Sequence, residues 1–187
     1  MKGKSTLWII GIIAVIIIFF QYNGSNSKNS FERSAEGLQF AEGNRIIELS
    51  DGGTLELSAD AVKQNVNGKE IKMLGYNGQI PGPLIKVKQG TSVSVDFTNN
   101  IGQETTVHWH GLRLENSFDG VPGLTQEEVK DGETFRYELK FPDAGMYWYH
   151  PHVREDYQQE LGLYGNILVS PSNEDYFGPV DREEYLF

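Results

Sequence analysis

Nine short runs of alternating or β-branched residues recur between residues 45 and 170, separated by turn signals. Alternation with a period of two puts successive side chains on opposite faces, which is typical of a β-strand. The separators are turn pairs such as Asn67-Gly68 and Asp131-Gly132. The predicted strands are residues 45–49, 54–58, 69–76, 84–87, 91–98, 105–110, 133–141, 146–150 and 166–170. The pattern predicts an all-β fold, an antiparallel Greek-key β-sandwich over residues 40–171.

The first 22 residues have a different character and predict a membrane-anchor or signal helix. Lys2 and Lys4 precede residues 7–20, a run of 14 that is apolar apart from one glycine. As a helix this run is about 21 Å long, against roughly 30 Å of membrane hydrocarbon. Extending it to residues 5–22 gives about 27 Å. Length alone therefore does not separate an anchor from a cleaved signal.

The residues that follow favour an uncleaved anchor. Ser25 and Ser27 offer only a weak version of the small-residue pattern that signal peptidase requires. A buried core helix is the less favoured alternative, because the run is uncharged and flanked by lysines. The lysines then stay in the cytoplasm, which predicts an extracytoplasmic domain. Residues 23–39, rich in Asn and Ser at their start, are interpreted as a flexible tether.

Composition excludes several classes of protein. The 187-residue chain has no cysteine, so it has no disulfide, no thiol nucleophile, no cysteine-ligated zinc or iron–sulfur site and no type 1 copper. It has 26 acidic and 16 basic side chains, a formal charge of −10, and no long basic block. Nucleic-acid binding needs a positive surface, so no nucleic-acid partner is expected. Any metal must be held by histidine or carboxylate.

All four histidines fall into two motifs, His108-Trp109-His110-Gly111 and His150-Pro151-His152. On a strand, residues i and i+2 share a face and lie about 6.6–6.8 Å apart, a spacing that suits two neighbouring metals. Thr106, His108 and His110 are therefore expected on one face, with Val107 and Trp109 in the core. The two pairs predict that the four imidazoles, of His108, His110, His150 and His152, together form a cup that is open toward a partner surface.

The residues alone leave the nature of this cup open. A single His-x-His pair is more often an ordinary surface or core feature than a metal site. Two pairs favour a metal site, for which copper and zinc are both candidates. A tetrahedral zinc site with four histidines is sterically awkward but remains an alternative.

The wording of the motifs favours copper, because residues 76–171 resemble the first cupredoxin domain of multicopper oxidases of the laccase-like and bilirubin-oxidase-like kind. The resemblance covers about half of the chain. It is carried by Tyr-Asn-Gly-Gln-Ile-Pro-Gly-Pro (76–83), Val-Lys-Gln-Gly (87–90), His-Trp-His-Gly (108–111), Asp-Gly-Val-Pro (119–122), Tyr-Trp-Tyr-His-Pro-His (147–152) and Glu-Leu-Gly-Leu-Tyr-Gly (160–165).

The resemblance implies a role for each histidine in a trinuclear copper cluster that reduces dioxygen to water. His108 matches a ligand of the type 2 copper, His110 and His150 match ligands of one type 3 copper, and His152 matches a ligand of the other. Asp119 matches an acidic residue that supports proton delivery, although an ordinary Asp-Gly turn explains it equally well. The aromatic residues among the motifs are interpreted as packing around the ligands: Trp109, Trp148 and Tyr149.

The family's other cluster ligands, and those of its type 1 copper, have no counterpart in this chain. Residues 172–187 are interpreted as a linker into a missing C-terminal cupredoxin domain, so the chain is expected to be inactive alone. Another subunit could also complete the cluster, and the electron donor is not identified. The alternatives are a stand-alone copper-binding module for storage or delivery, and a structural relative that has lost its chemistry. Intact ligands in both motifs argue against the last.

Overall fold

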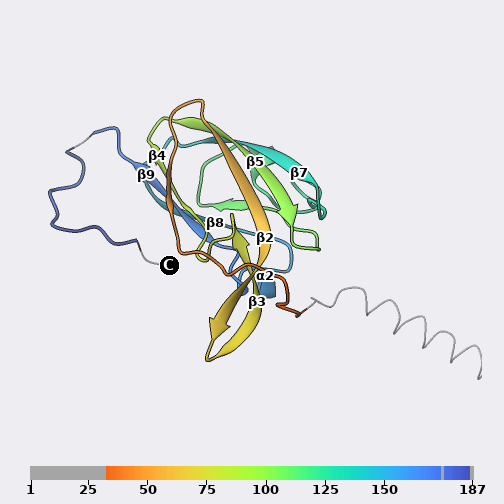
Figure 1. Cartoon of the computed structure of the whole chain (residues 1–187). Helices are drawn as coiled ribbons and strands as arrows, with labels where there is room; N and C mark the ends of the chain where they lie inside the picture. Colours follow the sequence, from red (N-terminus) through yellow and green to blue (C-terminus); the bar gives the residue numbers. More distant parts are fainter. Residues whose placement is uncertain (1–32, 174, 186–187) are drawn as a thin grey trace, which may run out of the picture. The chain divides into compact units, whose positions relative to one another are not determined.

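The computed structural model describes residues 33–173 and 175–185. Within them the chain forms two β-sheets and two short helical turns, η2 (Asn116–Phe118) and α2 (Glu155–Gln158) (Figure 1). The strands are β1 (Ile46–Glu48), β2 (Thr54–Val66), β3 (Lys69–Tyr76), β4 (Leu84–Lys88), β5 (Ser92–Asn100), β6 (His108–His110), β7 (Thr134–Lys140), β8 (Gly145–His150) and β9 (Gly165–Ser170). Each of the nine corresponds to one predicted run, and the all-β prediction is confirmed.

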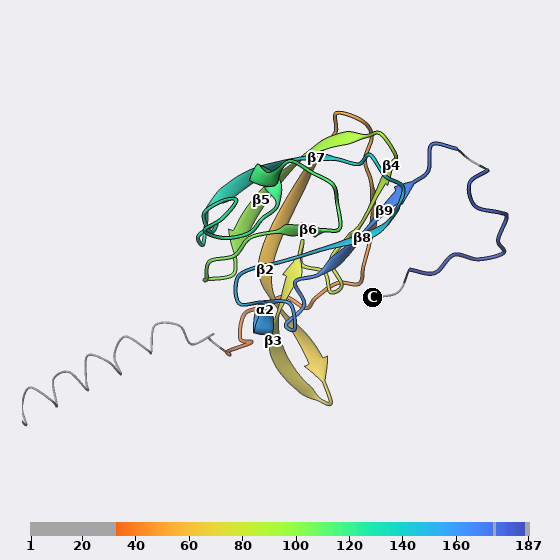
Figure 2. The ribbon, with the colours of Figure 1, turned by 180° about the vertical axis from the view of Figure 1, so that it is seen from behind.

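The strands are divided between a five-stranded sheet, ordered β1-β4-β9-β8-β6, and a four-stranded sheet, ordered β3-β2-β5-β7 (Figure 2). The sheets are mixed, because β1 with β4, β4 with β9 and β2 with β5 pair in parallel. The prediction of an antiparallel sandwich is wrong in this respect. The chain changes sheets between most successive strands, so strands that pair are far apart in sequence and their relative direction leaves no trace in the local pattern.

The core lies between the two sheets and is built from alternating positions. In β2, Leu55 and Leu57 are buried, and in β5 Val95 and Phe97 are buried, each separated by a more exposed residue. The facing sheet contributes buried residues from β4 and β9 at the same period: Ile85, Val87, Ile167 and Val169. Side chains at alternate positions of these strands are therefore buried, as the alternating sequence pattern predicted.

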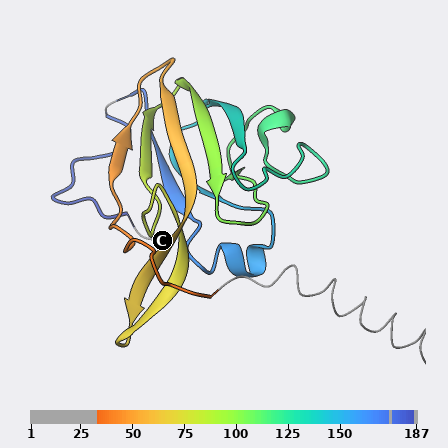
Figure 3. The ribbon, with the colours of Figure 1, turned by 45° about the vertical axis from the view of Figure 1, so that its right-hand side comes forward.

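Strand β2 continues eight residues beyond the predicted run, from Ala59 to Val66, and pairs along all of β3. The hairpin turns at Asn67 and Gly68, whose φ angles are +52° and +80°, as a two-residue type I′ turn requires. The far half of this hairpin extends beyond the sandwich (yellow in Figure 3) and is more exposed. Its polar residues lack clean alternation, which is why the prediction ended β2 early.

Strand β6 is shorter than the predicted run 105–110. Thr105 instead forms an isolated bridge with Val129. The backbone N–H of Val107 donates to the hydroxyl oxygen of Tyr137 at 3.0 Å, so a core side chain replaces a strand neighbour. The ladder therefore begins at His108, the first residue of the first histidine motif.

The predicted anchor at residues 1–22, and the tether up to residue 32, lie outside the described residues. Within the part of the chain that the structure describes, no helix is long and apolar enough to span a membrane. Residues from Ala35 onward group into one compact unit.

Candidate metal centre

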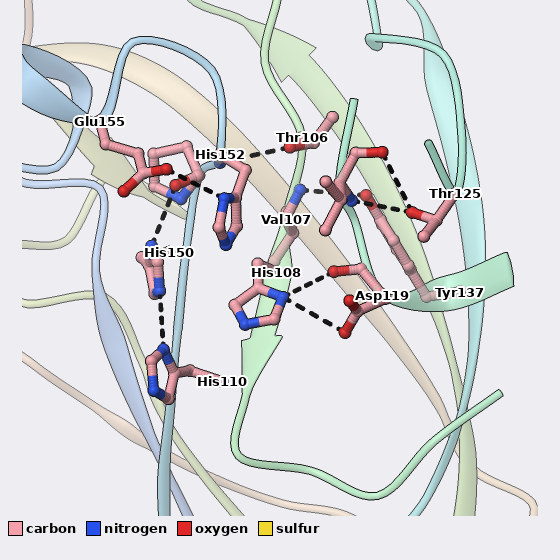
Figure 4. Close-up of polar contacts among 12 residues, drawn as sticks. Thr106, Val107, His108, His110, Asp119, Thr125, Tyr137, His150, His152 and Glu155 are labelled. Carbon is pink, nitrogen blue, oxygen red and sulfur yellow. Dashed lines mark hydrogen bonds and ion pairs between the residues drawn. The ribbon is translucent and has the colours of Figure 1, made fainter. Parts of the chain in front are cut away.

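The pairing of β6 with β8 brings the two histidine motifs together. His108 lies opposite His150 in the ladder, and His110 lies opposite Trp148. His152 follows β8 after one intervening residue, Pro151. Strands that are about forty residues apart in the chain thus place all four imidazoles in one cluster, in which the side chains face one another (Figure 4). The predicted side-by-side arrangement of the two pairs is confirmed.

Burial of the intervening residue turns the two histidines of the first motif outward. Val107 and Trp109 are fully buried, whereas His110 is exposed and His108 is half-buried. Because adjacent strand residues point to opposite faces, burying Trp109 presents both imidazoles on the other face. The predicted outward exposure is wrong for His150, which is only 4% exposed and has Trp148 stacked on its ring. The prediction for Val107 and Trp109 is confirmed.

Thr106 departs from its predicted outward position. It is fully buried, and its hydroxyl oxygen accepts the backbone N–H of His152 at 3.3 Å. The residue joins the first motif to the second instead of lining the open face, because the segment carrying His152 folds over it.

The rings are close enough to share metal ions. Ring centroids are 4.4 Å apart for His108 and His152, and 5.3 Å apart for His108 and His150. One ligand nitrogen from each of His108, His110 and His150 lies within 4.8 Å of the other two. These distances satisfy the basic requirement of a multi-histidine metal site, convergent nitrogen atoms without intervening backbone.

Contacts at Nδ1 orient three rings, two through hydrogen bonds and one through an ion pair. The Nδ1–H of His108 donates to the carbonyl oxygen of Asp119 at 2.7 Å, and that of His150 donates to the carbonyl oxygen of Pro151 at 2.9 Å. His152 Nδ1 lies 2.9 Å from Oε1 of Glu155. Carbonyl and carboxylate oxygens only accept, so each Nδ1 carries the proton and each Nε2 presents a lone pair.

His110 is oriented the other way. Its Nδ1 lies 3.3 Å from Nε2 of His150 (Figure 4). Two nitrogen ligands about 2.0–2.1 Å from one ion, at a tetrahedral angle, are about 3.3–3.4 Å apart. The separation of this pair therefore fits two ligands of a single metal ion, and the donor set fits copper or another metal that prefers imidazole.

Burial keeps two of the ligands neutral. It lowers the pKa of His150 from 6.5 to about 4, although the Pro151 carbonyl opposes the shift. Burial also lowers the pKa of His152, whereas the Glu155 carboxylate raises it. A neutral imidazole binds a metal without first releasing a proton, so the cluster is ready for metal at neutral pH.

Asp119 follows η2 and lies beside His108. Its carboxylate Oδ1 is 3.4 Å from His108 Nδ1, further than its own carbonyl oxygen, and the side chain is one-third exposed. Gly120 makes this approach possible. A Cβ at Gly120 would lie 2.0 Å from the carbonyl oxygen of Val107, and its φ of +75° favours glycine. The Asp-Gly pair thus forms a turn that also sets a carboxylate against a ligand.

A family-level comparison matches residues 59–174 to the family described as multicopper oxidase. The chain belongs to the multicopper oxidase family. Copper resistance protein A of Pseudomonas syringae pv. tomato is 31% identical over 137 residues, 73% of this chain and 22% of that protein. Multicopper oxidase MmcO of Mycobacterium tuberculosis is 37% identical over 121 residues, 65% of this chain and 23% of that protein.

A solved structure, the multi-copper oxidase from Pseudomonas thermotolerans, matches with a TM-score of 0.65 and 38% identity, over 71% of this chain and 32% of that one. The cupredoxin-like fold and the resemblance to multicopper oxidases are confirmed. The chain spans about a fifth of the length of these curated relatives. Copper is thereby established as the metal of the family, and oxidation as its activity.

Aromatic side chains pack around the histidine cluster of this multicopper oxidase domain, and one of them, Trp148, contacts the imidazoles directly. Trp148 stacks on His150, with ring centroids 4.0 Å apart and planes at 22°, and lies 4.9 Å from His110. Trp109 and Tyr149 are buried beneath the cluster, 5.7 Å apart. The Trp148 contacts hold the imidazole planes of His110 and His150 in place.

Sequence reasoning missed two polar residues that position the second motif. Gln158 is fully buried in α2, where it accepts from Thr105 Oγ1 at 2.7 Å and donates to the Glu104 carbonyl oxygen at 2.9 Å. Glu155 pairs with His152. Both belong to the strongly polar run 154–160, whose composition is typical of a solvated segment, so neither the burial of Gln158 nor the contact of the exposed Glu155 with His152 can be predicted from it.

Proposed function

We propose that this chain is the first cupredoxin domain of a multicopper oxidase and supplies half of the ligands of a trinuclear copper cluster. The observation that carries the proposal is the convergence of four imidazoles from two paired motifs: nitrogens of His108, His110 and His150 lie within 4.8 Å of one another, and the His152 ring lies 4.4 Å from that of His108. Four ligands are too few for three copper ions, so the open side of the cup calls for a second ligand set.

The orientation of the rings supports one assignment of ligands to metals. His110 through Nδ1 and His150 through Nε2 hold one type 3 copper, because these two nitrogens are 3.3 Å apart. His108 holds the type 2 copper through Nε2, since its Nδ1 is bonded to Asp119. His152 holds the other type 3 copper through Nε2, since its Nδ1 faces Glu155.

When bound, the cluster supplies the reduction of dioxygen to two molecules of water by four electrons and four protons. The side chains of this domain orient the metals and deliver protons. The Asp119 carboxylate is partly exposed and adjacent to His108, so it can take a proton from solvent and pass it toward the cluster.

The other ligands must come from elsewhere, because the chain has four histidines, all used here, and no cysteine for a type 1 copper. A C-terminal cupredoxin domain or another subunit would close the cup and receive electrons from the donor. In this proposal residues 40–171 form the domain and 172–187 lead toward the next. Residues 1–22 anchor it, uncleaved, on the extracytoplasmic side of a membrane.

Copper titration of the full chain, with oxygen uptake as a second readout, tests this function. The chain alone should bind copper, show no intense blue thiolate band and consume no oxygen with a phenolic donor. Adding a cupredoxin domain that carries a His-Cys-His motif should tighten copper binding and start turnover. Oxidation of the phenol by the purified chain alone would overturn the proposal. So would an unchanged copper content when His108 and His110 are both replaced by alanine.

A second function, a stand-alone copper-binding module, is favoured by one distance. The ligand nitrogens of His108, His110 and His150 lie within 4.8 Å of one another, so the chain could hold one copper ion by itself. Tight, stoichiometric binding by a monomer, unchanged on adding the second domain, would support storage or delivery. Weak binding that tightens on addition supports the oxidase.

A further inference from the structure

The Nδ1 partners of the histidines are chemically unequal. His108 and His150 donate to backbone carbonyl oxygens, at 2.7 and 2.9 Å. His152 faces a carboxylate oxygen of Glu155 at 2.9 Å. An ionised acceptor makes a stronger hydrogen bond than a neutral carbonyl and pushes more electron density into the ring. Of the three described rings that are held at Nδ1, His152 thus has a partner of a different kind.

The fold holds Glu155 in this position from both sides. The backbone N–H of His152 is tied to Thr106, and Gln158 at the end of α2 is tied to Thr105 and Glu104. Between these anchors the chain turns sharply at Arg154, where φ is +46°. The His152–Glu155 pair therefore lies in a short segment fixed at both ends to residues 104–106, which lead into the first motif.

The neighbouring charges do not compete for the Glu155 carboxylate. The guanidinium of Arg154 donates two hydrogen bonds to Asp156, at 2.8 and 2.9 Å. The Arg154 guanidinium, the cation next to Glu155 in the chain, is thus paired in bidentate fashion with Asp156. Glu155 is left to accept from His152.

We propose that Glu155 is a positioning residue for copper, which holds His152 in the Nδ1-protonated tautomer and strengthens its Nε2 as a ligand. This inference rests on the proposed copper function and adds a residue to it. One consequence is that the two type 3 coppers are inequivalent in this proposal, since a backbone carbonyl stands behind His150 and a carboxylate behind His152. The pair is partly exposed, 27% for His152 and 49% for Glu155, so its effect is on ligand geometry more than on stability.

Nitrogen-15 NMR of the copper-free full chain tests the tautomer directly. At neutral pH, His152 should be protonated at Nδ1 in the wild type. Glu155→Ala should give a mixture of tautomers, whereas Glu155→Gln should largely restore the Nδ1–H form, because its amide oxygen still accepts. Glu160→Gln, at an exposed acid further along the chain, is the matched control and should change nothing. His108, held by a backbone carbonyl, should keep its tautomer in every variant.

Copper affinity provides the second readout. Loss of an outer partner of a ligating histidine typically costs 10–100-fold in metal affinity, so Glu155→Ala should weaken copper binding by about that factor and Glu155→Gln by less. Unchanged tautomer and affinity in Glu155→Ala, with His152→Ala still losing copper, would overturn the role of Glu155 and leave the proposed function intact. Absence of histidine-dependent copper binding in the wild type would overturn both.

Discussion

His108 and His150 lie directly opposite each other in the β6–β8 ladder, with ring centroids 5.3 Å apart. A slip of one residue in this register would set Tyr149 against His108 and turn one motif to the opposite face of the sheet. The metal centre therefore depends on strand register as well as on the presence of histidines. Trp109 enforces the register, because it is fully buried opposite Tyr149.

The proposal that His110 and His150 share one copper ion predicts strong coupling between them. His110→Ala and His150→Ala should each weaken copper binding at least about 10-fold. The second substitution should cost much less in the background of the first, since both remove ligands of the same ion. A double-mutant cycle in competition titrations measures this coupling. The cycle of His110→Ala with His152→Ala is the control and should be nearly additive; additivity in both cycles would contradict the shared ion.

Asp119 is predicted to act through its carboxylate without orienting His108. The Nδ1–H of His108 is held at 2.7 Å by the backbone carbonyl, which Asp119→Ala retains. Nitrogen-15 NMR should therefore find the His108 tautomer unchanged in this variant. Oxygen uptake by the assembled oxidase should fall about 100-fold or more, as for loss of a proton donor. A changed tautomer would show that the carboxylate has a structural role instead.

The turn after Asp119 is predicted to tolerate no side chain at Gly120. Gly120→Ala should lower the free energy of unfolding by about 2–5 kcal/mol, because its Cβ would overlap the Val107 carbonyl and its φ is positive. Gly123→Ala is the matched control. Its φ is +69° but nothing lies within 4 Å of the added Cβ, so it should cost only about 1–2 kcal/mol. Urea denaturation of both variants measures the difference, and equal losses would contradict the close approach.

The sequence predicted the strands well where burial alternates. Val93, Val95 and Phe97 are buried at every second position, and the β5 run was found within two residues at either end. The outward positions of His108 and His110 followed from the same rule, because Trp109 between them is apolar, whereas His150 is buried contrary to the prediction. The pairing directions did not follow, since the partner of β2 in the parallel ladder is set by sheet crossovers and not by any local pattern.

The sequence pattern also failed to predict which polar residues are buried. Thr106 and Gln158 are fully buried, yet both residue types are mostly exposed in proteins and neither stands in a hydrophobic run. Each is buried because it satisfies a specific hydrogen bond to a segment distant in sequence. Such pairs depend on tertiary contact, so the supporting residues of the metal centre are visible only in the structure.

Tyr76 and Tyr149 are buried and in contact, with ring centroids 5.0 Å apart. Loss of the hydroxyl is predicted to affect the free energy of unfolding differently at the two positions. The Tyr149 hydroxyl donates to the Pro83 carbonyl oxygen at 2.7 Å, so Tyr149→Phe should cost about 1–2 kcal/mol by leaving that oxygen unpaired. Within the described residues the Tyr76 hydroxyl has no hydrogen-bond partner. Tyr76→Phe should therefore be neutral or stabilising in urea denaturation. A large loss in Tyr76→Phe would reveal a partner for that hydroxyl.

Gln158 is predicted to couple the stability of the domain to its copper affinity. Gln158→Met keeps much of the side-chain volume but removes the acceptor for Thr105 and the donor to the Glu104 carbonyl, which should cost about 1–3 kcal/mol. Because α2 also carries Glu155, copper binding should weaken as well. Gln159→Met, at the next position, should change stability by less than about 0.5 kcal/mol. Urea denaturation and copper titration compare the two variants. Equal stability and equal copper affinity of Gln158→Met and Gln159→Met would refute the anchoring role of Gln158.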